Sequence, residues 1–135
     1  MALTPIIKGM SGGAEAIQAN FTAIGEIKKG TNANGTHIKF PDGTMICHGR
    51  VSFSSLAITA QWGAFYLSPG LSVTFPATFV GTPPAISTNM ENTTGEVATW
   101  YNVLATINSF DGYFGSAVRQ TFPCTLSWMA IGRWK

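Results

Sequence analysis

The chain has 135 residues, of which 45% are hydrophobic and only 10% carry a formal charge, against about 25% charged residues in a typical soluble domain. This hydrophobic content excludes a disordered tail, and a net charge of +2 with one basic pair, Lys28-Lys29, excludes an extended nucleic-acid footprint. No apolar run approaches the roughly 20 residues of a membrane span, and the N-terminus lacks the apolar core of a signal peptide. We therefore expect no membrane insertion, and synthesis in a cytoplasm.

The low charge density also bears on assembly. A surface with few charges favours coverage by other subunits over a compact monomer coated with Thr, Ser and Asn side chains. The length fits one domain with a short appendage, since a β-sandwich takes about 100 residues. We expect one small domain that assembles into an oligomer.

The first thirty residues differ from the rest of the chain. Residues 1–11 are interpreted as an extended arm that either docks onto something else or is loose. Residues 12–30 are expected to form one short amphipathic helix that ends at Gly30. A helix of about 14 residues is marginal alone, so its apolar stripe must be buried against its own domain, a partner or copies of itself. The stripe has spacings of three, four and three residues and consists of Ala14, Ile17, Phe21 and Ile24.

From residue 31 onward the sequence predicts turns and strands. Residues 31–36 have the composition of a linker, and a β domain is expected at 37–135. The segment Pro41-Asp42-Gly43 predicts a hairpin turn, because Pro41 presets φ and Gly43 accepts a positive φ. Short strands without intervening helices predict an antiparallel β-sandwich. The strands are expected at 36–40, 44–53, 63–67, 71–76, 84–90, 99–107, 113–120 and 124–134, with a second hairpin turn at 108–112.

The last predicted strand is apolar on both faces. Leu126, Trp128 and Ala130 alternate on one face, and Met129 and Ile131 lie on the other. A strand of this kind is normally covered on both faces, whereas one small sandwich covers only one. The second face is therefore expected to meet a neighbouring subunit, unless a bulge restores one-sidedness.

The chain offers little catalytic or metal-binding chemistry. It contains no nucleotide-binding loop, zinc-protease motif or serine-hydrolase motif. Cys47 and Cys124 lie among apolar residues of predicted strands and are expected to be buried free thiols, with a disulfide as the alternative. A carboxylate pair drawn from Glu91, Glu96 and Asp111 is the weakly supported enzymatic alternative. We expect no catalytic residue, no metal site and no cofactor.

Binding chemistry is better represented. Saccharide recognition uses aromatic faces that stack on C–H surfaces and short polar groups that engage hydroxyls. Such side chains gather near predicted loops, in segments 60–66, 92–102 and 108–114. A place in the core is the alternative for each of them, but together they exceed what a core of this size needs. The predicted saccharide-binding residues are Trp62, Trp100, Tyr101, Asn102, Asp111 and Tyr113.

Four stretches of the sequence carry a resemblance to a known family. NGTHIKFPDGTMICHGRVSF (34–53), WGAFYLSPGLSVTFPATFVGTPPAIS (62–87) and SWMAIGRWK (127–135) resemble the head domains of phage tail and baseplate adhesins, which are H-type-lectin-like or tail-fibre-tip domains. IIKGMSGGAEAIQANFTAI (6–24) is similar to the N-terminus of small baseplate receptor-binding proteins from siphophages of Gram-positive bacteria. The likeness spans nearly the whole chain, but only KKGTNANGT (28–36) separates the helix from the head, where the family has a longer neck.

The resemblance implies a mostly β, homotrimeric receptor-binding protein of the virion tail, assembled in the bacterial host cytoplasm. Its N-terminal arm would attach to a larger baseplate protein, a three-helix bundle would follow, and a non-enzymatic β-sandwich head would bind host cell-wall polysaccharide. Trimer contacts are then expected from the helix stripe and the last strand, at Ala14, Ile17, Phe21, Ile24, Trp128 and Ile131. The alternatives are a structural collar or adaptor that binds no host surface, and a small polysaccharide depolymerase.

Overall fold

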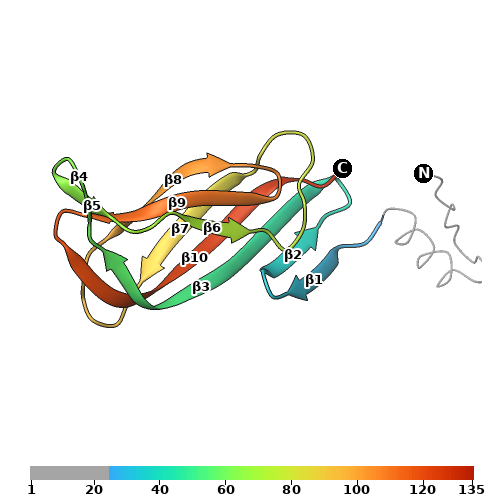
Figure 1. The fold of residues 1–135 in the computed structure, drawn as a ribbon. Coiled ribbons are helices and arrows are strands. Elements are labelled where there is room, and N and C mark those ends of the chain that lie inside the picture. The colour runs from blue at the N-terminus through green and yellow to red at the C-terminus, as the bar shows by residue number, and fades with distance from the viewer. Residues whose placement is uncertain (1–24) are drawn as a thin grey trace, which may run out of the picture.

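The computed structural model describes residues 25–135, and these residues form ten β-strands in two antiparallel sheets that face each other (Figure 1). Sheet 1 has the strand order β1 (Lys28–Asn32), β2 (Gly35–Lys39), β3 (Thr44–Ile58), β10 (Gln120–Arg133) and β7 (Ala85–Glu91). Sheet 2 contains β4 (Ala60–Trp62), β5 (Phe65–Leu67), β9 (Ser109–Ser116), β6 (Leu71–Thr74) and β8 (Thr99–Ala105), with β8 paired to β9. The predicted antiparallel β-sandwich is confirmed. The hairpin of β1 and β2 and the hairpin of β4 and β5 lie at opposite ends of it (Figure 1).

The start of the described chain differs from the expectation. Lys28 to Gly30, predicted as the end of the helix, belong to β1, and the predicted linker forms the rest of the β1–β2 hairpin. The Asn32 side chain closes the turn by accepting a hydrogen bond from the backbone N–H of Asn34 at 2.8 Å. The two lysines suit a strand at the edge of a sheet, where charged side chains discourage further pairing.

The predictions for residues 1–24 lie outside the described residues. These are the arm at 1–11, the body of the helix and the three-helix bundle. The stripe residues concerned are Ala14, Ile17, Phe21 and Ile24.

Of the two predicted hairpin turns, one is confirmed and one is wrong. At 41–43 the Asp42 carboxylate accepts a hydrogen bond from the Thr44 backbone N–H at 2.8 Å, and Gly43 has a φ of 97°. Asp111, expected in a turn, lies within β9, because β6 and β8 pair with that segment on its two sides. The chain turns earlier, where the Thr106 hydroxyl accepts hydrogen bonds from the N–H groups of Asn108 and Ser109, each at 3.1 Å.

The core lies between the two sheets and is rich in aromatic rings. β10 turns Leu126, Trp128 and Ala130 inward, where all three are buried. The Trp128 ring lies 5.7 Å from Phe110 of sheet 2, centroid to centroid. Trp128 was predicted to lie either in the core or at a trimer contact, and its side chain is buried in the core of its own chain. Met129 and Ile131 do lie on the outer face, each 42% exposed.

Both cysteines are free and buried, as expected. Burial raises the pKa of the Cys47 thiol to about 11, and burial also raises the pKa of Cys124. Both side chains are therefore protonated near neutral pH and act as small apolar core residues.

Candidate functional site

An apolar pocket of about 560 Å³ opens on the outer face of sheet 2. Its walls come from the β4–β5 hairpin and from the neighbouring parts of β8 and β9. Three of the six predicted saccharide-binding residues, Trp62, Tyr101 and Tyr113, meet here although they are far apart in the sequence. The lining residues are Ala60, Gln61, Trp62, Phe65, Leu67, Ser68, Tyr101, Val103 and Tyr113.

The aromatic side chains of this pocket are presented to solvent. Trp62 is 68% exposed and Tyr101 47% exposed. Both are held by β pairing: Trp62 opposes Phe65 across the β4–β5 hairpin, and Tyr101 opposes Tyr113 between β8 and β9. Exposed aromatic rings on a fixed backbone provide flat apolar platforms at a small entropic cost.

The absence of a side chain at Gly115 leaves the space that the Tyr101 ring occupies. A Cβ atom at Gly115 would lie 2.6 Å from Tyr101 Cε2, closer than real contacts allow, and 3.2 Å from Leu67 Cδ2, which is a tight contact. The ring therefore lies directly over the glycine backbone of β9. Tyr113 lies beside Gly70, where an added Cβ would make only an ordinary contact, 3.4 Å from its ring.

A second hollow, of about 420 Å³, adjoins the first and shares Val103 and Tyr113 with it. The pairing of β8 with β9 shifts between Asn102 and Leu104, which places Val103 in a bulge between the two hollows. Asp111 lines this second hollow, opposite Ser72 on one side and Leu104 on the other. Its Oδ1 atom is buried and has no hydrogen-bond partner among the described residues.

The two remaining predicted residues are placed differently. Trp100 is only 8% exposed and packs in the core against Phe110 and Phe114, with centroid distances of 5.9 and 5.1 Å. Its ring therefore has no free face for a sugar. Asn102 is exposed, but its carboxamide oxygen accepts a hydrogen bond from the Trp100 indole N–H at 2.5 Å. This contact ties Asn102 to the core and not to the pocket.

The outer face of sheet 1 carries an apolar row, which consists of Ile38, Ile46, Ile131 and Ala85. These four residues are direct cross-strand partners on β2, β3, β10 and β7. Met129 extends the row along β10. Side chains of one cross-strand row point to the same face of a sheet, so the row forms a continuous apolar strip, in which Ile131 and Ala85 are exposed and Ile38 and Ile46 half-buried.

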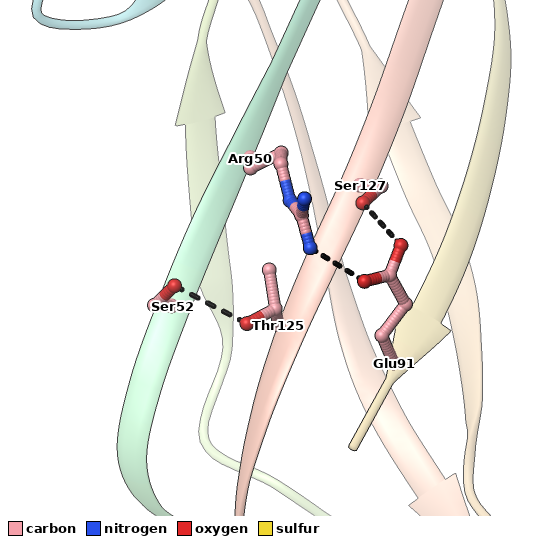
Figure 2. Close-up of polar contacts among 5 residues, drawn as sticks. All are labelled: Arg50, Ser52, Glu91, Thr125 and Ser127. Atoms are coloured by element: carbon pink, nitrogen blue, oxygen red, sulfur yellow. Dashed lines mark hydrogen bonds and ion pairs between the residues drawn. The ribbon is translucent and has the colours of Figure 1, made fainter. Parts of the chain in front are cut away.

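A polar patch lies further along the same face, about 13 Å from the row, because Ser127 precedes Ile131 by four residues of β10. The Arg50 guanidinium pairs with the Glu91 carboxylate at 2.5 Å, and the Ser127 hydroxyl donates to the other carboxylate oxygen at 3.0 Å (Figure 2). Ser52 and Thr125 hydrogen-bond to each other beside it, at 3.2 Å. A hollow of about 520 Å³ lies beside these contacts, and it is lined by Arg50, Ser52, Phe53, Ser54, Glu91, Asn92, Thr93, Pro123, Cys124 and Thr125.

This patch was not predicted from the sequence, although a signal was present. Arg50, Ser52, Thr125 and Ser127 occupy alternate positions of two predicted strands, which is the spacing of one outer face. That Glu91 joins them depends on β7 pairing with β10, a non-local feature.

Residues 25–135 contain no cluster of three His, Cys, Asp or Glu side chains placed to hold a metal ion. Over the same residues, no helix has the length and apolar character needed to cross a membrane.

No protein-family model matches the sequence, and no curated protein matches it significantly. Solved structures do match the fold. The C-terminal part of an R1 pyocin fibre from P. aeruginosa aligns with a TM-score of 0.64 at 15% identity, over 98% of this chain and 35% of that one. An N-truncated R1-type pyocin tail fibre gives 0.61 at 15% identity, covering 92% and 98% of the two chains. An R2 pyocin fibre from P. aeruginosa gives 0.56 at 20% identity, covering 98% and 33%.

The chain therefore has a tail-fibre-type fold. It spans about a third of the length of the R1 and R2 fibre fragments and almost all of the N-truncated R1-type fibre.

Proposed function

We propose that this protein is the receptor-binding head of a phage or phage-derived tail and binds a saccharide of the host surface. The observation that carries the proposal is the pocket on sheet 2, where Trp62, Tyr101 and Tyr113 converge. Exposed aromatic rings beside polar groups are the side chains that sugar rings engage, by stacking and by hydrogen bonds. The tail-fibre-type fold supports the same role.

The position of the pocket supports an adhesive role. Trp62 lies on the β4–β5 hairpin, at the end of the sandwich opposite β1, through which the chain enters the head (Figure 1). An N-terminal arm attached to a larger baseplate protein would thus hold the pocket away from the virion. We propose that this baseplate belongs to a siphophage of Gram-positive bacteria, which the resemblance carried by residues 6–24 supports.

The proposal includes a homotrimer, with sheet 1 as the face that meets the other subunits. The row of half-buried Ile38 and Ile46 and exposed Ile131 supplies an apolar centre, and the Arg50–Glu91 pair supplies a polar rim, as protein interfaces commonly do. Sheet 2 then stays free for ligand. Three copies of a weak saccharide site would gain strength through avidity.

The proposed activity is binding without catalysis. A glycosidase-type pair would bring two carboxylates to one cleft. Glu91 lies on the outer face of sheet 1, bound to Arg50, whereas Asp111 lies on the outer face of sheet 2. These two acids flank opposite faces of the sandwich, so they form no such pair with each other. The Glu96 carboxylate accepts a hydrogen bond from the Thr94 hydroxyl in its own loop. This arrangement favours an adhesin over a depolymerase.

Retention of the fluorescently labelled full chain on whole cells tests the proposal. The panel should include Gram-positive candidate hosts and P. aeruginosa, because the sequence motifs and the fold point to different bacteria. We expect saturable retention on a subset of strains. Absence of retention on every strain, with the protein folded by circular dichroism, would favour the adaptor function instead.

A further inference from the structure

The sheet 2 site differs from the sheet 1 patch in its charge. Among the residues that line its two hollows, only Asp111 carries a formal charge, and none is Lys or Arg. The sheet 1 patch, in contrast, contains an arginine. A site with one carboxylate and no cation repels carboxylates and phosphates, and burial beside apolar walls strengthens that repulsion.

The unpartnered oxygen of Asp111 indicates what the ligand must supply. Buried polar atoms are nearly always hydrogen-bonded, so an orphaned carboxylate oxygen is a departure that needs a cause. Its cross-strand neighbours are Leu104, which has no donor, and Ser72, whose hydroxyl makes no bond to it in the structure. An ionised carboxylate only accepts hydrogen bonds, so its missing partner is a donor such as a hydroxyl, an amide N–H or an ammonium group.

The bulge at Val103 provides the route to this oxygen. Val103 and Leu104 are both exposed, and they separate the aromatic pocket from the hollow of Asp111. A sugar ring stacked on Tyr101 and Tyr113 would place its substituents at this partition. Asp111 lines the hollow on the far side of this partition, beside its cross-strand partner Leu104, within reach of such substituents.

We propose that the sheet 2 site selects sugars that lack acidic groups, and that Asp111 binds them by accepting a hydrogen bond from a hydroxyl, acetamido or amino substituent. This inference rests on the proposed function and specifies its ligand class. Acidic sugars and phosphorylated polymers are rejected by the same carboxylate.

Matched competitors test the ligand class. Binding of the full chain to cells of a retaining strain is measured with glucose against glucuronic acid, galactose against galacturonic acid, and N-acetylglucosamine against its 6-phosphate. In at least one pair the uncharged member should compete about tenfold better than its acidic partner, and in no pair should the order be reversed. Stronger competition by an acid, equal competition within every pair, or no competition by any uncharged sugar overturns the inference.

Asp111→Asn tests the role of the residue. This change keeps the shape and removes the unpartnered charge, so the melting temperature should stay the same or rise, while binding to cells should fall about tenfold. A purely structural Asp111 would instead lower the melting temperature and leave the sugar preference unchanged, which would contradict the inference. Trp62→Ala in the same assay separates the two proposals: if it abolishes retention while Asp111→Asn has no effect, the adhesive site stands and the role of Asp111 falls.

Discussion

Trp100 and Tyr101 are neighbours in the sequence, yet β8 turns their side chains to opposite faces of sheet 2. Trp100 packs into the core against Phe114, and Tyr101 lies outside over Gly115. Successive side chains of a strand point to opposite faces. Inward-facing residues of sheet 2 therefore stabilise the core, and outward-facing residues are available to contact a ligand. Two substitutions, one residue apart, should therefore have opposite consequences.

Trp100→Ala should destabilise the fold, and Tyr101→Ala should not. Loss of a buried indole costs about 3–5 kcal/mol of unfolding free energy, whereas truncation of a half-exposed ring on the outer face should cost about 1 kcal/mol or less. Urea unfolding followed by fluorescence measures both, and adsorption to cells should fall for Tyr101→Ala while its fold is intact. Equal stability of the two variants would contradict the assignment of Trp100 to the core.

Gly115→Ala should weaken binding although it replaces none of the side chains that are proposed to contact the ligand. The new methyl group would meet Tyr101 Cε2 at 2.6 Å, so the ring must swing away from its seat. Adsorption should fall about as far as in Tyr101→Ala. The double variant should be no worse than either single one, because both changes act through the same ring. Additive losses would show that Gly115 acts by another route.

Ile131→Lys should dissociate the proposed trimer. Ile131 is 42% exposed within the apolar row of sheet 1, and a charge in the middle of an apolar interface is costly unless it is paired. Size-exclusion chromatography with light scattering should give three times the chain mass for the native protein and a lower mass for the variant. Val118→Lys is the matched control: Val118 is also an exposed aliphatic residue, but it follows β9 and lies outside the row. A native protein of monomer mass would refute the trimer.

The cysteine thiols should be unreactive in the folded protein. Burial raises the pKa of Cys47 to about 11 and also raises that of Cys124, so at about pH 8 neither thiol supplies much reactive thiolate. Ellman's reagent should label both in urea and neither in buffer. Because the raised pKa favours the protonated folded state, the stability from Cys47 is present below its ordinary pKa of 9.0 and is lost as the pH rises toward about 11. Rapid labelling of the native chain would contradict this burial.

Much of the fold followed from local pattern. The Pro41-Asp42-Gly43 turn and the alternation of β10 gave the first hairpin and both faces of the last strand correctly. The segment at 108–112 misled, since Asp-Gly is a strong turn signal, but pairing on both sides of β9 extends it through Asp111. Helix propensity at Lys28-Lys29 was likewise outweighed by pairing with β2.

The site could be predicted only in part, because strand parity decides which face an aromatic residue takes. Trp62, Tyr101 and Tyr113 were predicted and meet in one pocket. Trp100 and Trp128 belong to the core. A shift of one residue in strand register would have turned both side chains to the outer face. The Arg50–Glu91 pair arises from the adjacency of β3, β10 and β7, which no local pattern encodes.

Retention of the Trp62→Ala variant on cells of a binding strain tests whether the sheet 2 pocket is the adhesive site. Trp62 is 68% exposed, so its truncation should leave the fold intact and remove a large part of the pocket wall. Val80→Ala is the control, because Val80 is also exposed but does not line the pocket. Its backbone N–H donates a hydrogen bond to the carbonyl of Arg133, at the end of β10. We expect at least a tenfold loss of adsorption for Trp62→Ala, because the loss at each site is multiplied in a multivalent contact. Val80→Ala should adsorb like the native protein. If Trp62→Ala adsorbs like the native protein, the sheet 2 pocket is not the adhesive site.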